Sequence, residues 1–282
     1  MRAYGQAGRH YFLIAFMQYL RSDDADIAYE IRGNGPPVVL LHPFPCNHEF
    51  WNPVAAAFEA RYRLILPDLR GHGDSGIGEG PALMQKHASD IARVLDAAAI
   101  GKAVFIGCSI GGYILFEFWR RYRQRVRGLV LSDTRPQADT EEGRANRLKA
   151  AEDVLQRGSE PFIDSMLPKL LGESTRQSRP DLVQAAKRMM MKGSAEGIAQ
   201  VQRGMAARPD SVESLKTINV PTLLTVGSED TLTPVADAEF MRQNIGGSQL
   251  RVIPRGGHYA AFEQSEATLP LLHHFLDSLP SA

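Results

Sequence analysis

Short apolar runs recur along the chain, and most of them end in Gly, Pro, Asp or Ser. Runs of this length predict buried strands, because aliphatic side chains suit a sheet that is covered on both faces. The predicted strands are 38–42, 64–68, 104–108, 129–132, 222–226 and 250–253, preceded by a hairpin of 19–21 with 27–31. Helical periodicity lies between the later strands, at 50–60, 87–99, 110–123, 235–244 and 267–278. This alternation predicts a mostly parallel central sheet that is flanked by helices.

Residues 135–218 interrupt the alternation, because this stretch has no convincing strand pattern. It contains amphipathic helical segments at 141–156, 161–171, 180–192 and 195–206. We therefore predict a single α/β core made of residues 1–134 and 219–282, with a helical cap of residues 135–218 inserted between two strands. Residues 1–16 precede the first strand pattern and are expected to form an N-terminal extension.

The amino-acid composition limits the classes of molecule that we expect the protein to bind. The 282 residues include 32 Lys plus Arg and 32 Asp plus Glu, so the formal net charge is zero. A zero balance gives no global electrostatic reason to expect nucleic acid or an anionic membrane as a partner. The longest apolar run, residues 11–17, is too short for a membrane helix. The expected partner is a small, largely neutral molecule, and the expected state is a monomer or a homodimer.

Two cysteines, Cys46 and Cys108, are too few for a disulfide framework and lack the spacing of a metal site. A reducing, cytoplasmic location is the corresponding prediction. No glycine pattern typical of a nucleotide-binding loop follows an early strand. The sequence therefore predicts neither a metal nor a cofactor.

The segment 104–113 carries the clearest chemical pattern. It places Gly107-x-Ser109-x-Gly111 directly after a predicted strand and directly before a predicted helix. So sharp a reversal crowds the residues two before and two after its apex, which glycine relieves, and it exposes the apex hydroxyl. Ser109 is thus the candidate nucleophile.

A serine nucleophile needs a base, and the base needs an acid that orients it. Of the eight histidines, His258 is the best candidate, because it follows the last predicted strand on a glycine-rich loop. Asp230 or its neighbour Glu229 follows strand 222–226 and can supply the acid, with Asp230 favoured. Asp133, after strand 129–132, is a rival for that role.

The order Ser109, Asp230, His258 resembles the nucleophile–acid–base order of the α/β-hydrolase superfamily. The segments 40–45, 68–75, 220–230 and 257–264 are similar, in the same order, to that family's oxyanion loop, its Asp-x-Arg-Gly-His-Gly-x-Ser signature and its acid and histidine regions. Within the family, the chain most resembles the esterases and lactonases that are similar to 3-oxoadipate enol-lactonases. The segments that carry this resemblance are 117–122, 129–135 and 208–211. The resemblance implies an α/β-hydrolase fold with a helical cap and a Ser-His-Asp triad.

The same resemblance places the oxyanion hole at two backbone N–H groups, those of Phe44 and Ile110. Pro43 stands where the family often has Gly, but this does little harm if the next residue is the donor. His42 then braces its loop. The residues expected near the substrate pocket are Trp51, Tyr113, Met166, Met190, Tyr259 and Phe262.

The resulting functional hypothesis is a serine hydrolase that cleaves carboxylic esters of small to medium size through an acyl-enzyme. Hydrolysis of lactones, of the enol-lactone type, or of carbon–carbon bonds could use the same triad. An enol-lactone would need a cation for its carboxylate, and the sequence offers Arg144, Arg147, Arg203 and Arg208. A binding protein or receptor on this fold is the alternative from another class, and a degraded triad would favour it.

Overall fold

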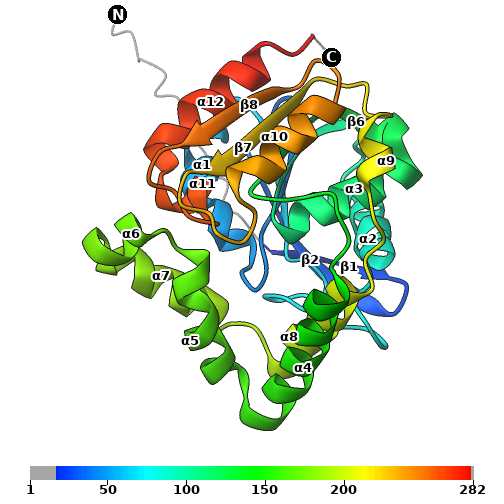
Figure 1. The fold of residues 1–282 in the computed structure, drawn as a ribbon. Coiled ribbons are helices and arrows are strands. Elements are labelled where there is room, and N and C mark those ends of the chain that lie inside the picture. Colours follow the sequence, from blue (N-terminus) through cyan, green and yellow to red (C-terminus); the bar gives the residue numbers. More distant parts are fainter. Residues whose placement is uncertain (1–16, 281–282) are drawn as a thin grey trace, which may run out of the picture.

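Eight strands form one sheet in the computed structural model of the protein, which describes residues 17–280 (Figure 1). Their order across the sheet is β1-β2-β4-β3-β5-β6-β7-β8. The strands are β1 (Gln18–Ser22), β2 (Ala25–Arg32), β3 (Pro37–Leu41), β4 (Arg63–Pro67), β5 (Ala103–Cys108), β6 (Val126–Ser132), β7 (Thr222–Gly227) and β8 (Gln249–Ile253). Strand β2 pairs antiparallel with β1 and β4, and all other pairs are parallel. The predicted hairpin and mostly parallel sheet are confirmed, whereas the predicted extension 1–16 lies outside the described residues.

Helices from both halves of the core flank this sheet (Figure 1). They are α1 (Asn52–Phe58), α2 (Met84–Ala97), α3 (Ile110–Tyr122), α10 (Val235–Asn244), α11 (Ala260–Glu263) and α12 (Ser265–Asp277), with 3₁₀ turns at His48–Trp51 and Arg123–Arg125. Helix α1 packs on α12, and α2 packs on α3. Arg120 and Arg121 in the last turn of α3 both pair with Glu117, and their positive charges complement the helix dipole.

Between residues 133 and 221 the chain forms helices and no strand. They are α4 (Glu141–Arg157), α5 (Ser159–Leu170), α6 (Glu173–Ser178), α7 (Pro180–Met190), α8 (Ala195–Ala206) and α9 (Val212–Leu215). Thr140 and Ser194 cap the first turns of α4 and α8, each accepting a backbone N–H three residues on. Helices α6, α9 and α11 were not predicted, because 4–6 residues are too few to show a helical period. None of the helices within residues 17–280 is both long and apolar enough to span a bilayer.

Parallel pairing brings the carboxyl ends of β3 and β5–β8 to one edge of the sheet. The chain leaves that edge at His42, at Ser109, at Asp133 and at the loops that carry Asp230 and His258. Ligand sites in open parallel sheets form at this edge, since loops from neighbouring strands converge there.

Three histidines outside the loop of His258 are buried in the core. They are His42, His72 and His87. The Leu69 N–H donates to His42 Nε2, so the remaining ring proton sits on Nδ1 and donates to the Pro43 carbonyl oxygen, at 3.0 Å. His42 thus braces its loop, as predicted. Burial lowers the pKa of His42 to about 3 and that of His72 to about 4, and it lowers the pKa of His87 well below its ordinary value. All three imidazoles are neutral in the folded protein at pH 7.

We expect His87→Met to become progressively more stable than the parent chain as pH falls from 6.5 to 5. In the unfolded chain a histidine takes up a proton below about pH 6.5, whereas the depressed pKa of folded His87 keeps that ring neutral. The parent chain therefore loses about 1.4 kcal/mol per pH unit through this residue, and the variant does not. Urea unfolding of both proteins at pH 7, 6 and 5 measures the difference. His274→Met is the control, because that side chain is exposed on α12, and a difference for His87→Met that does not vary with pH would contradict the expectation.

Candidate active site

Ser109 lies at the sharp turn between β5 and α3, with φ 55° and ψ −113°. A Cβ atom on Gly107 would lie 2.7 Å from the carbonyl oxygen of Gly111, and one on Gly111 would lie 2.6 Å from that of Leu41. Both glycines are therefore required: Gly107 for the crowding within the turn that the sequence pattern suggested, and Gly111 because β3 passes close beside it. The Thr134 hydroxyl donates to the Ser109 carbonyl oxygen at 2.8 Å and helps to hold the turn. A serine in this backbone region is strained by about 1–3 kcal/mol, which is typical of functional turns.

His258 connects Ser109 to Asp230. Its Nδ1 lies 2.8 Å from Asp230 Oδ2, and its Nε2 lies 2.8 Å from Ser109 Oγ. Burial alone would raise the pKa of Asp230, but the charge of His258 and hydrogen bonds from His258 and Thr233 hold it below its ordinary value. An ionised carboxylate only accepts, so Nδ1 carries the ring proton and Nε2 is free to accept the proton of Ser109.

Asp230 is held in place by the turn that follows it. Its Oδ1 accepts the backbone N–H groups of Leu232, at 2.8 Å, and Thr233, at 3.0 Å. Its Oδ2 accepts the Thr233 hydroxyl at 2.6 Å in addition to His258. The two oxygens therefore have separate tasks, one toward the backbone and one toward the imidazole.

Asp133, the alternative candidate for the acid, is directed toward β6 and β7 and not toward His258. Its Oδ1 accepts the Gly227 N–H and its Oδ2 accepts the Ser132 hydroxyl, at 2.8 Å and 2.7 Å. No hydrogen bond joins it to His258 among the contacts of residues 17–280. Burial, reinforced by the charge of Asp230, raises the pKa of Asp133 well above its ordinary value.

Phe44 lies on the loop after β3 and lines the same cavity as Ser109. Its carbonyl oxygen accepts the Tyr259 hydroxyl at 2.8 Å, which fixes the loop from behind. Ile110 is the first residue of α3, where backbone N–H groups have no partner within the helix. Both residues lie near Ser109. The role of their backbone N–H groups as an oxyanion hole stays a proposal.

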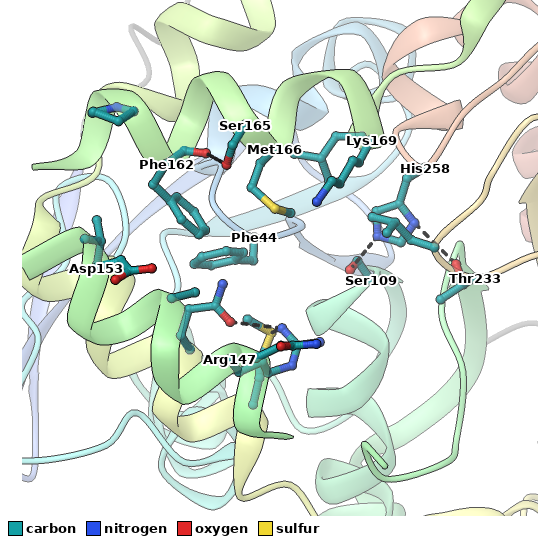
Figure 2. Close-up of a pocket in the computed structure, with 18 of the residues that line it drawn as sticks. Phe44, Ser109, Arg147, Asp153, Phe162, Ser165, Met166, Lys169, Thr233 and His258 are labelled. Carbon is teal, nitrogen blue, oxygen red and sulfur yellow. Dashed lines mark hydrogen bonds between the residues drawn. The ribbon is translucent and has the colours of Figure 1, made fainter. Parts of the chain in front are cut away.

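A cavity of about 400 Å³ opens above Ser109 and His258 (Figure 2). Residues of α4 and α5 form most of its wall, and Leu232 and Thr233 contribute from the loop after β7. Figure 2 shows the Phe44 and Phe162 rings near its middle, with centroids 5.9 Å apart. Two of the expected pocket residues, Tyr113 and Met166, line this cavity. Its volume suits a small ligand.

Four other expected pocket residues do not line it, and the structure corrects their placement. Trp51, Met190, Tyr259 and Phe262 are buried in the hydrophobic core. Three of these residues pack around Phe50, whose ring centroid lies 4.9–5.9 Å from those of Trp51, Tyr259 and Phe262. This buried aromatic cluster supports the loop of Phe44 from inside, since the Tyr259 hydroxyl donates to the Phe44 carbonyl oxygen.

Two carboxylates join the segment after α5 to the loops of the triad. Glu263 accepts the N–H groups of Gly172 and Gly257, at 2.7 Å and 2.9 Å, and so connects that segment to the residue before His258. Glu229, the neighbour of Asp230, accepts the Ser174 N–H at 2.8 Å. The backbones approach so closely here that a Cβ on Gly257 would lie 2.1 Å from the Gly172 nitrogen. The helical segment is thus fixed to the acid and base loops at this point.

Sequence reasoning missed several residues of this site, including Thr233, Phe162 and Glu263. Thr233 had a usable signal, because a polar residue three positions after an aspartate commonly closes a turn on it. Glu263 lies in the segment 257–264 that resembles the family's histidine region, but its contact with Gly172 was not predicted, and Phe162 gave no signal, since these contacts join segments far apart in the chain. Within the described part of the chain, no cluster of three or more His, Cys, Asp or Glu is arranged to hold a metal.

Comparison with known proteins places this geometry in context. A family model described as the alpha/beta hydrolase fold matches residues 36–265. The chain is 30% identical over 257 residues to 3-oxoadipate enol-lactonase 1 of Acinetobacter baylyi, covering 90% of this chain and 94% of that protein. It is also 30% identical to a putative carbamate hydrolase of Azorhizobium caulinodans, over 86% of this chain and 91% of the relative.

Solved structures agree with these matches. A thermophilic esterase from Thermogutta terrifontis superposes with a TM-score of 0.90 at 35% identity, covering 93% of this chain and 98% of the esterase. The enol-lactonase of Burkholderia xenovorans superposes with a TM-score of 0.86 over 93% of this chain and all of its own length, at 23% identity. The second likeness concerns the fold alone.

Proposed function

The chain belongs to the α/β-hydrolase fold family, and on that premise we propose that it is a serine hydrolase that cleaves carboxylic esters of small to medium size. The observation that carries the proposal is the continuous contact from Ser109 through His258 to Asp230, with both distances at 2.8 Å. All three side chains are buried, and Ser109 and His258 line one cavity. Residues 135–218 are the proposed cap over it.

In the acylation step, Ser109 Oγ attacks the ester carbonyl carbon while His258 Nε2 takes the serine proton. Asp230 stabilises the imidazolium that forms and keeps its ring oriented. The carbonyl oxygen becomes an oxyanion between the N–H groups of Phe44 and Ile110, each worth about 10²–10³-fold in rate. Collapse of this intermediate breaks the ester C–O bond, and His258 gives its proton to the departing alcohol.

Deacylation repeats these steps with water as the nucleophile. His258 takes a proton from the water, the hydroxide attacks the acyl carbon, and the proton returns to Ser109 Oγ as the carboxylic acid leaves. The histidine therefore alternates between base and acid, which requires its Nε2 to reach both the serine and the leaving group.

Lactone hydrolysis is the second candidate, because a lactone is an internal ester and needs the same machinery. A relative named as an enol-lactonase, similar over 90% of this chain, favours it. Hydrolysis of carbon–carbon bonds also remains compatible with the triad. A panel of nitrophenyl esters, simple lactones and an enol-lactone would separate these substrates by their kcat/KM values.

We expect a fluorophosphonate probe to label the protein once, at Ser109. The activated serine attacks phosphorus and displaces fluoride, which gives a stable adduct that intact-mass and peptide mass spectrometry detect. His258→Ala should slow labelling greatly, because the hydroxyl then has no base.

Ser165→Ala is a matched control for this experiment. Ser165 also lines the cavity, but its hydroxyl donates to the Phe162 carbonyl oxygen and has no histidine beside it. Its loss should leave labelling unchanged. Labelling of Ser109→Ala at the parent rate would refute the assignment of the nucleophile.

A further inference from the structure

The cavity wall carries more positive than negative charge. Among the described residues that line it, the cations are Arg135, Arg147, Arg157 and Lys169, and Asp153 is the carboxylate. The whole chain has 32 basic and 32 acidic residues, so this excess is local. A concave surface with an excess of one charge attracts ligands of the other charge.

Part of the excess comes from three guanidinium groups that share one carboxylate. Asp139 lies 2.7 Å from Arg208, 2.6 Å from Arg147 and 3.3 Å from Arg135. One carboxylate balances one of these three cations. Arg135 and Arg147 reach the cavity, and Arg208 stacks over the ring of Tyr113, 4.3 Å from its centroid. Asp237 also interacts electrostatically with Arg135, so this end of the cavity keeps a smaller net positive charge.

Lys169 brings a further cation to the catalytic end. It lies in the last turn of α5, and Figure 2 shows its side chain directed into the cavity between Met166 and His258. The backbone fixes this position, because the Tyr259 N–H donates to the Leu170 carbonyl oxygen at 3.1 Å. Within residues 17–280 no carboxylate lies at ion-pair distance from Lys169, whereas Lys187 on α7 is paired with Asp164 at 2.6 Å.

We propose that Lys169 is a specificity residue that binds a carboxylate group of the substrate, so that this site prefers anionic esters to neutral ones. The inference rests on the proposed function, since Ser109 must cleave the ester that Lys169 helps to hold. An ammonium group offers three donors, and its hydrogen bonds to a carboxylate are stronger than those between neutral groups. Arg147, across the cavity, strengthens the potential that attracts the anion (Figure 2).

Matched ester pairs test this preference. Monomethyl glutarate and methyl pentanoate differ only in a carboxylate at the end of the acyl chain. The anion 4-acetoxybutanoate and butyl acetate differ in the same way on the alcohol side. Titration of the released acid at constant pH gives kcat/KM for each. We expect the parent protein to prefer the anionic member of at least one pair by about tenfold, the usual scale for a hydrogen bond to a charged group.

Variants at Lys169 then test whether this side chain causes the preference for the anionic ester. Lys169→Met should abolish it, Lys169→Glu should reverse it, and Lys169→Arg should keep most of it. Lys149→Met is the control, because Lys149 is an exposed lysine like Lys169 but does not line the cavity. Equal kcat/KM values within both pairs would overturn the proposal, as would a preference that survives Lys169→Met. Failure to cleave any ester would instead contradict the proposed function, so the two outcomes are distinguishable.

Discussion

Ser109→Ala is expected to lower kcat/KM for ester hydrolysis by on the order of 10⁴-fold or more, and His258→Ala by a similar factor. Without Ser109 Oγ there is no acyl-enzyme, and water must attack the ester directly. Without His258 the hydroxyl keeps its proton, because no other base contacts Ser109 Oγ among the described residues. Steady-state assays with a nitrophenyl ester measure both losses.

The double variant tests whether the two residues act as one unit. Its loss should be close to that of either single variant, since removing a second member of an already broken triad costs little more. Additive losses would mean that Ser109 and His258 contribute through separate steps. Thermal unfolding controls for stability, and Ser109→Ala should not destabilise the fold, because its hydroxyl contacts only the His258 ring in this structure.

The sequence was sufficient to predict that Ser109, Asp230 and His258 lie at the same edge of the sheet. The apolar runs before Ser109, Asp230 and His258 predict strands buried on both faces, and such strands are parallel neighbours. Their carboxyl ends then meet, whatever the loop conformations are. The glycine at 107 was predictable for the same kind of reason, because a Cβ there clashes with Gly111 inside the local turn, whereas the clash that excludes a side chain at 111 comes from Leu41 on a distant strand.

The pocket wall was not predictable from the same information. Trp51 lies shortly after the loop of Phe44 in the sequence, but it is buried by packing on Phe50 and does not line the cavity. Phe162, more than a hundred residues later, takes the place beside Phe44. Which residues of a helix face a neighbouring segment depends on contacts between distant parts of the chain, and hydrophobic periodicity does not record those contacts.

Net charge is a similarly incomplete guide to the site. A sum over 282 residues is zero and led to the expectation of a neutral substrate, which stays a prediction. The charges nearest to a bound ligand are those on the cavity wall, and Arg135, Arg147 and Lys169 reach it from three separate segments. The local field at the site therefore differs from anything that composition reports.

Asp230→Asn is expected to lower kcat by about 10⁴-fold, whereas Asp133→Asn should lower it by less than about tenfold. Two backbone N–H groups, of Leu232 and Thr233, hold Oδ1 of Asp230. An asparagine there must keep its oxygen at that position, so its NH₂ group faces His258. The amide then donates to Nδ1, the ring proton moves to Nε2, and Nε2 can no longer take the proton of Ser109.

Asp133→Asn differs because it replaces the acid with an amide of the same shape that does not contact His258. Burial raises the pKa of Asp133 and disfavours its charged form, so a neutral amide suits this site. The amide oxygen can still accept the Gly227 N–H, and the Ser132 oxygen can accept from the amide NH₂. Steady-state kinetics of both variants at pH 7, with a nitrogen-15 spectrum of His258 to identify its tautomer, would check this ranking. If Asp133→Asn caused the larger loss, the orienting role would belong to the acid after β6.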